Sequence, residues 1–131
     1  MIAKVFGWFE GNYIMAVICT VLVFIALFMP GDPEPGEEIP HLDKVIHLLM
    51  FAGMCFCWLM VRINENSDSY VIYVLLALIV LTVGSELIQY YWIPRRSGDW
   101  FDGLADTVGI ATGLLTYRIW LKSKRSKAVK Q

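Results

Sequence analysis

The sequence predicts an all-α protein, specifically an integral membrane four-helix bundle with both termini in the cytoplasm. Of the 131 residues, 57% are hydrophobic and only 18% are charged, and the hydrophobic residues form four long blocks. Each block approaches the roughly 20 residues that a helix needs to cross about 30 Å of hydrocarbon. The blocks lack the alternating pattern of barrel strands, and only helices or closed barrels satisfy every backbone group in lipid.

The four blocks, taken in chain order, each predict one helix of a single domain that covers residues 1–131. The first block has no charge and ends before Pro30, which cannot continue a helix. The others contain few charges: the second has only His47, the third only Glu86, and the fourth Asp106 and Arg118. The predicted helices cover residues 12–29, 43–61, 70–93 and 100–121, and a basic cytoplasmic tail follows at 122–131.

The charged residues between the helices indicate the orientation. Four crossings place both termini on one side, and with that side as the cytoplasm eight of the eleven Lys and Arg residues lie inside. This distribution agrees with the positive-inside rule. The acids show the opposite bias, because nine of the twelve fall on the outer side. We therefore expect a multi-pass protein whose acidic groups gather at the outer face.

Several of these acids lie inside apolar helices, where an ionisable group costs about 2.5–3.5 kcal/mol and is rare unless it is paired or used. The helical rise places Glu86 and Asp106 each about 10 Å below the outer end of its helix. His47 follows Asp43 by one turn on the same face. Three helices thus direct polar groups toward one outward-facing pocket. The candidate pocket residues are Asp43, His47, Glu86, Gln89, Arg95, Arg96, Asp99, Asp102 and Asp106.

The last predicted helix carries its polar and small residues in one stripe, with successive spacings of three and four residues. The stripe consists of Asp99, Asp102, Asp106, Gly109 and Gly113. The two glycines lie four residues apart, which is typical of a surface where two membrane helices pack closely. We therefore predict that Gly109 and Gly113 serve helix packing.

Several candidate residues also have purely structural interpretations. Asp43 and Asp99 are compatible with helix N-caps, where Asp is favoured. A lone histidine such as His47 is compatible with packing alone. Arg95 and Arg96 are compatible with surface ion pairs. The membrane-embedded Glu86 most strongly favours a functional role.

The polar residues form a recognisable pattern from about residue 42 to 115. Its motifs are Asp43-Lys44…His47…Phe51, Glu86-x-x-Gln89, and Arg96-x-x-Asp99-x-x-Asp102-x-x-x-Asp106-x-x-Gly109-x-x-x-Gly113. This pattern resembles the VanZ-like family of small bacterial membrane proteins. The resemblance implies a location in the bacterial cytoplasmic membrane and a link to resistance against the glycopeptide teicoplanin. The family usually has Asn where this chain has Asp106, so the chain adds an ionisable group to the pocket.

Three functions remain open at this point. In the first, the pocket binds a phosphate-bearing or other polar envelope head group, and the arginine pair suits phosphate. In the second, the protein is a metal-dependent intramembrane hydrolase of a lipid phosphate or ester, in which a divalent cation activates water. The third is a component of proton- or ion-coupled transport. The candidate metal ligands are His47, Glu86, Asp102 and Asp106.

The expected partners are membrane lipids and a lipid-linked or glycopeptide ligand, and no nucleic acid is expected. A small bundle of this kind is also compatible with a homo-oligomer.

Overall fold

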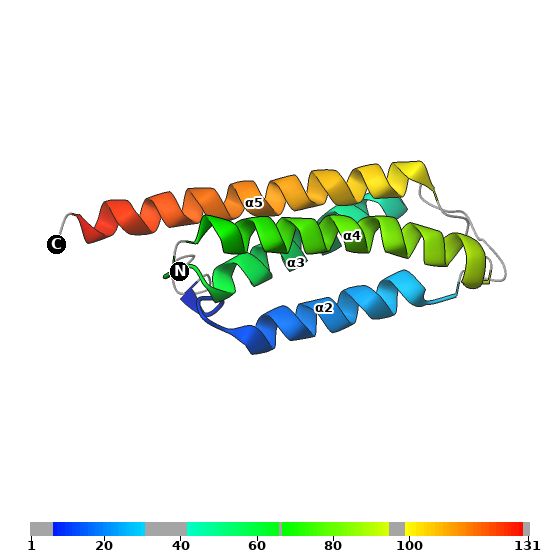
Figure 1. Cartoon of the computed structure of the whole chain (residues 1–131), viewed down its shortest axis with the longest axis horizontal. Coiled ribbons are helices and arrows are strands. Elements are labelled where there is room, and N and C mark those ends of the chain that lie inside the picture. The colour runs from blue at the N-terminus through cyan, green and yellow to red at the C-terminus, as the bar shows by residue number, and fades with distance from the viewer. Residues whose placement is uncertain (1–6, 31–41, 66, 95–98, 130–131) are drawn as a thin grey trace.

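The computed structural model describes residues 7–30, 42–65, 67–94 and 99–129. These residues form four helices and no strand, which confirms the all-α prediction for this part of the chain. The helices pack as an elongated bundle in which α2 begins and α5 ends at the same end (Figure 1). They are α2 (Tyr13–Phe28), α3 (Leu42–Val61), α4 (Asp68–Trp92) and α5 (Trp100–Ala128).

Local sequence signals explain where these helices begin. The side chain of Asn12 caps α2 by accepting a hydrogen bond from the backbone N–H of Met15 at 3.3 Å. Ser67 caps α4 in the same way through the N–H of Tyr70, also at 3.3 Å. Both caps satisfy backbone donors that the first helical turn leaves without a partner.

The last helix differs most from its predicted bounds. α5 continues to Ala128, beyond the predicted end at residue 121, so four basic residues expected in a tail lie on the helix: Lys122, Lys124, Arg125 and Lys127. The hydrophobic block ends near residue 121, but no Gly or Pro follows to stop the helix. Lys and Arg are good helix formers and are favoured in a last turn by the helix dipole. The end of the apolar block therefore did not mark the end of the helix.

The largest interface in the bundle joins α3 and α5. A Cβ atom added to Gly109 would collide with the carbonyl oxygen of Leu48 on α3. One added to Gly113 would lie 2.5 Å from the carbonyl oxygen of Ala52. The two helices thus approach backbone to backbone, and this close contact sets their relative position along the bundle.

The core lies mainly between α3 and its neighbours, whereas α4 leaves much of its apolar surface uncovered. Tyr73 and Val80 of α4 are each 71% exposed. By length and composition alone, α3 and α4 are the described helices that are long enough and apolar enough to cross a membrane. α2 has 16 residues, which span about 24 Å at the helical rise.

Polar contacts also join the elements at the end where α5 finishes. Lys124 donates a hydrogen bond of 2.6 Å to Glu10, which precedes α2. Trp120 donates to the other oxygen of that carboxylate at 3.0 Å. These contacts tie the last turns of α5 to the start of the described chain, while the candidate site lies at the opposite end of the bundle.

Candidate functional site

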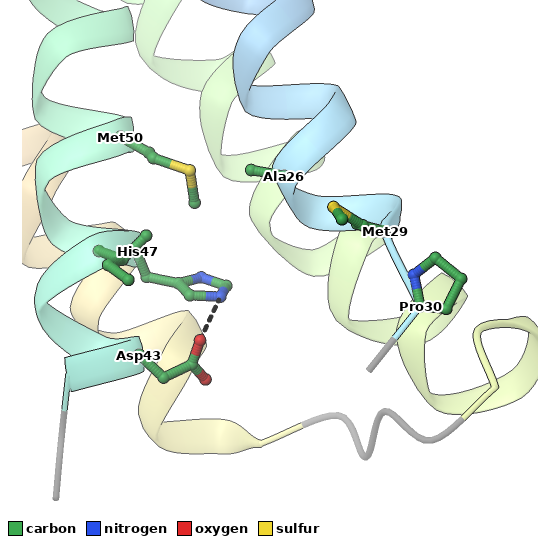
Figure 2. A pocket seen from close by; sticks show the side chains of 7 residues that line it. Ala26, Met29, Pro30, Asp43, His47 and Met50 are labelled. Atoms are coloured by element: carbon green, nitrogen blue, oxygen red, sulfur yellow. Dashed lines mark ion pairs between the residues drawn. The ribbon is translucent and has the colours of Figure 1, made fainter. Parts of the chain in front are cut away.

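The centre of the site is a buried contact between α3 and α5. The Nδ1 atom of His47 lies 2.9 Å from Oδ1 of Asp106, and both side chains are almost completely buried. An ionised carboxylate only accepts hydrogen bonds, so Nδ1 carries the proton when Asp106 is ionised. The other ring nitrogen, Nε2, faces Asp43 one turn earlier on α3, with 3.9 Å to its Oδ1 (Figure 2).

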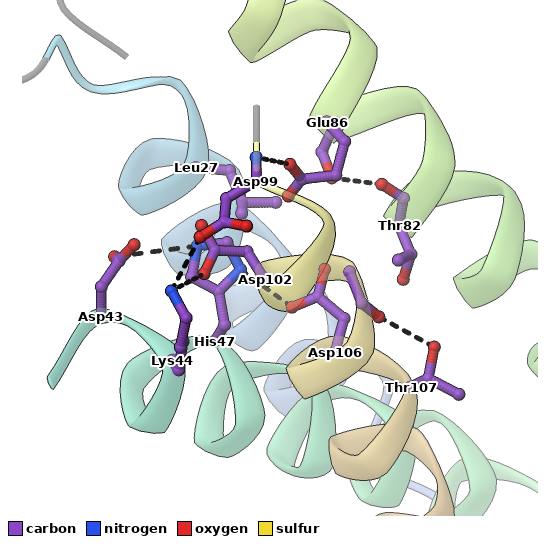
Figure 3. A network of polar contacts seen from close by, with 12 residues as sticks. Leu27, Asp43, Lys44, His47, Thr82, Glu86, Asp99, Asp102, Asp106 and Thr107 are labelled. Carbon is purple, nitrogen blue, oxygen red and sulfur yellow. Dashed lines mark hydrogen bonds and ion pairs between the residues drawn. The ribbon is translucent and has the colours of Figure 1, made fainter. Parts of the chain in front are cut away.

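Lys44 joins the start of α3 to the start of α5. Its Nζ donates to Asp99 at 2.9 Å and to Asp102 at 3.1 Å (Figure 3). Asp99 is also the N-cap of α5 and accepts the backbone N–H of Phe101 at 2.9 Å. The Phe101 N–H, and after it the Lys44 ammonium, hold the pKa of the Asp99 carboxyl below its ordinary value.

α4 contributes Glu86 to the same site. One carboxylate oxygen, Oε2, accepts the backbone N–H of Asp99 at 3.0 Å. The other oxygen, Oε1, is buried and has no hydrogen-bond partner among the described residues, and the same is true of Oδ2 of Asp106. The site therefore contains two buried acceptor atoms that the described part of the chain leaves unsatisfied.

The spacing of the side chains is compatible with a bound cation. One potential ligand atom from each of His47, Glu86 and Asp106 lies within 4.8 Å of the others. A second set consists of Asp43, His47 and Asp102, whose potential ligand atoms also lie within 4.8 Å of one another. We call the seven polar residues at this end the polar cluster: Asp43, Lys44, His47, Glu86, Asp99, Asp102 and Asp106.

Two cavities adjoin the polar cluster. A groove of about 430 Å³ has walls from α4 and α5, and Glu86 lines it together with apolar residues such as Leu87 and Trp100. A smaller cavity of about 210 Å³ has walls from α2 and α3, and Asp43 and His47 line it (Figure 2). Each cavity therefore reaches charged side chains of the cluster.

Comparison with known proteins identifies the family. The family model VanZ/LLP1 matches residues 5–121 of this chain. The chain belongs to this family. No curated protein and no solved structure matches it. Membership confirms the resemblance seen in the motifs and ties the protein in general terms to the resistance-associated VanZ group. Family membership and the two helices that are long and apolar enough to cross a membrane together favour a membrane protein.

The fold brings together only some of the motif residues that the sequence pattern predicted as a pocket. Those of the polar cluster come from three helices and contact one another as described above. Gln89 is buried but has another partner, because its amide donates to the carbonyl of Leu27 in the last turn of α2 at 2.9 Å. Gln89 thus donates to one of the last four carbonyls of α2, which have no partner within the helix itself. Arg95 and Arg96 lie outside the described residues.

Lys44 belongs to the polar cluster although it is not one of the candidate pocket residues predicted from the sequence. Its contacts with Asp99 and Asp102 are long-range in sequence and depend on the packing of α3 against α5. One signal in the sequence pointed to it. Lys44 is the single base between the acidic segment that ends at Asp43 and the apolar block that follows. A lone base in that position suits pairing with acids on a neighbouring helix.

Proposed function

We propose that this VanZ/LLP1 protein is a multi-pass protein of the bacterial cytoplasmic membrane whose polar end binds an envelope amphiphile. The head group contacts the polar cluster, and a hydrophobic chain lies in the groove between α4 and α5. One observation carries this proposal: Glu86 borders both the cluster and the groove.

The exposed surface of α4 supports a position in the membrane. Large apolar side chains along it, including Tyr73, Val80 and Leu87, are each more than half exposed. Extended apolar surfaces of this kind mark contacts with membranes or partners. Lipid is the simplest cover for a helix of 25 residues that is apolar along most of its length. The Lys and Arg asymmetry supports an outward-facing polar end.

The position of Glu86 suits an amphiphile. Inside the cluster its Oε2 accepts the Asp99 N–H, while the same side chain lines a groove whose walls include Leu87 and Leu104. Ligand sites are typically apolar cavities with a few placed polar groups that orient the ligand. A chain in the groove would present its head group to Glu86.

The charge of the polar cluster favours particular head groups. Among the described residues it contains five carboxylates against Lys44 and His47. Such a site favours a head group that donates hydrogen bonds or carries an amine. A phosphate would need positive charge from Arg95 and Arg96 or from a bound cation. We therefore place a zwitterionic, amine-bearing amphiphile first and an anionic, phosphate-bearing one without an amine second.

Fluorescence of Trp100 provides the test, because this side chain lines the groove and is 94% exposed. Purified protein in detergent is titrated with phosphatidylethanolamine that carries brominated chains, and with phosphatidylglycerol brominated in the same way. The quenching due to Trp100 is the difference between the wild type and Trp100→Phe. We expect saturable quenching, with tighter binding of the amine-bearing lipid.

Two glycine substitutions provide a matched pair. A Cβ on Gly103 would lie 3.8 Å from Thr82 and 3.9 Å from Glu86, so a leucine there projects into the groove. Gly84 has no atom within 4 Å of its Cβ position and does not line the groove. Gly103→Leu should weaken lipid binding roughly tenfold or more, which is about 1.4 kcal/mol, while Gly84→Leu should not. Equal binding by both variants would contradict the proposal.

Glu86→Gln tests the head-group contact and links it to the phenotype. The substitution removes the ionisable group and nearly preserves the shape. It should weaken binding of the amine-bearing lipid, leave helicity unchanged, and abolish any teicoplanin tolerance that the wild type confers on an expressing strain. Binding that is lost together with helicity would make Glu86 structural. Tolerance that persists without lipid binding would separate resistance from this site.

A further inference from the structure

Two carboxylates of the polar cluster have buried oxygens that lack a partner. They are Oε1 of Glu86 and Oδ2 of Asp106, and neither accepts a hydrogen bond from any described residue. A buried acceptor left unsatisfied costs roughly 1–3 kcal/mol, and more when the group is charged. Asp106 is completely buried, so water does not cover its free oxygen from outside. A hydrogen-bond donor such as an internal water, a proton or a cation would supply the partner that each oxygen lacks.

The described basic groups do not balance these acids. The Lys44 ammonium contacts Asp99 and Asp102, and it already serves two carboxylates. Among the described bases, His47 alone contacts Asp106, and it carries at most one positive charge. Negative charge that is buried in a protein is normally paired or coordinates a metal. A divalent cation beside Glu86 and Asp106 would supply the missing charge.

The side-chain positions are close to those of a coordination site. Potential ligand atoms of His47, Glu86 and Asp106 lie within 4.8 Å of one another. Two ligands of one ion lie roughly 3–4 Å apart when each bond is about 2.0–2.2 Å, so small side-chain rotations close the difference. The three residues come from α3, α4 and α5 respectively, and the packing of these helices holds the backbone in place (Figure 3).

We propose that His47, Glu86 and Asp106 bind one divalent transition-metal ion of the Zn²⁺ or Mn²⁺ type where α3, α4 and α5 meet. An imidazole nitrogen with two carboxylates suits such ions, whereas Mg²⁺ and Ca²⁺ prefer oxygen ligands alone. The ion satisfies the two free oxygens and links three helices. Binding of the ion does not depend on a bound amphiphile, so this proposal is independent of the proposed head-group site.

The overlapping set of Asp43, His47 and Asp102 is the less favourable position for the ion. The side chain of Asp43 is 57% exposed, and Asp102 is already held by Lys44. Neither carboxylate is among the buried side chains that have an unpartnered oxygen. The two positions can be distinguished because Asp43 belongs to one set and Glu86 to the other.

Metal binding by the purified full chain in detergent tests the proposal without added lipid. The protein is stripped with a chelator, dialysed against Zn²⁺, and its zinc content and affinity are measured. We expect about one Zn²⁺ per chain, with affinity at least about tenfold weaker in Glu86→Gln and in Asp106→Asn. Mg²⁺ should compete poorly.

A matched control removes a carboxylate elsewhere. Glu65→Gln changes an exposed glutamate that pairs with Arg62 at the opposite end of the bundle, and its Zn²⁺ affinity should equal that of the wild type. Co²⁺ provides a second readout. Its visible absorption should change on binding to the wild type, and the same change should need at least about tenfold more Co²⁺ with Glu86→Gln. Circular dichroism checks that each variant is folded. If Asp106→Asn does not fold, the Zn²⁺ affinity of Glu86→Gln alone tests the site.

Three outcomes would overturn the proposal. The first is a wild type that retains less than about one-tenth of an ion per chain, since water or protons then satisfy the free oxygens. The second is Zn²⁺ binding that persists unchanged in both variants, which indicates adventitious surface binding. The third is loss of Zn²⁺ in Asp43→Asn with retention in Glu86→Gln, which moves the ion to the other set. None of these results alters the quenching of Trp100 by brominated lipid, so the two proposals fail separately.

Discussion

Nδ1 of His47 and Oδ1 of Asp106 lie 2.9 Å apart across the interface of α3 and α5, and neither side chain is more than 1% exposed. This contact is the most deeply buried polar pair in the described part of the polar cluster. Removing one partner of such a pair leaves the other buried without compensation, which typically costs about 3–5 kcal/mol.

Substitutions of Asp106 should separate the hydrogen bond from the charge. The amide oxygen of Asp106→Asn can still accept the His47 N–H, so we expect its free energy of unfolding to stay within about 1 kcal/mol of the wild type. Asp106→Ala removes the acceptor and should lose roughly 3 kcal/mol. Unfolding in mixed micelles measures both variants. Equal losses would show that the charge, rather than the hydrogen bond, stabilises this contact.

Gly109 should be intolerant of any side chain. Gly109→Ala places a methyl group against the carbonyl of Leu48, and overpacking of this kind costs roughly 1–3 kcal/mol. The control is Gly84→Ala on α4, where a methyl group meets nothing within 4 Å and removes the conformational freedom of glycine. Thermal unfolding should therefore show a lower midpoint for Gly109→Ala and an equal or higher one for Gly84→Ala. A stable Gly109→Ala variant would contradict the close packing of α3 and α5.

The lowered pKa of Asp99, caused first by the Phe101 N–H and then by Lys44, predicts a specific pH dependence. The pKa of Asp99 in the folded protein is lowered, so its stabilising contribution is complete above the unfolded value of about 4. The contribution disappears as the pH falls through the lowered folded value. Asp99→Asn removes the charge but retains a good N-cap residue. The difference in unfolding midpoint between the wild type and Asp99→Asn should be constant above about pH 5 and should shrink in more acidic buffer. A difference that does not change with pH would show that ionisation of Asp99 adds nothing to stability.

Cysteine labelling of intact cells tests the orientation, which rests on the eight-to-three asymmetry of Lys and Arg. The three native cysteines are first replaced. Cysteines introduced at Glu37 and Gly98 should react with an impermeant thiol reagent, while one at Ser126 should not. Labelling of Ser126 from outside would reverse the orientation and move the polar cluster to the cytoplasmic face.

The sequence by itself determined the secondary structure and the candidate residues of each helix. The apolar blocks identified the four described helices. A local sequence pattern is sufficient for this, because the hydrogen bonds of an α-helix connect residues only four apart. Periodicity likewise placed Asp102 and Asp106 on one face of α5, since side chains three or four residues apart share a face. The end of α5 was harder to predict, because the hydrophobic block stops before the helix does.

Only the tertiary structure decided which partner each polar side chain meets. Gln89 lies one turn from Glu86 on α4, yet its amide contacts the carbonyl of Leu27 on α2. Lys44 contacts acids that are more than fifty residues away in the sequence. Such pairings depend on the rotation and axial position of one helix relative to another. The contact of Gly109 with the backbone of Leu48 sets that position for α3 and α5, and it depends on atoms of both helices at once. Periodicity within a single helix carries no information about this distance.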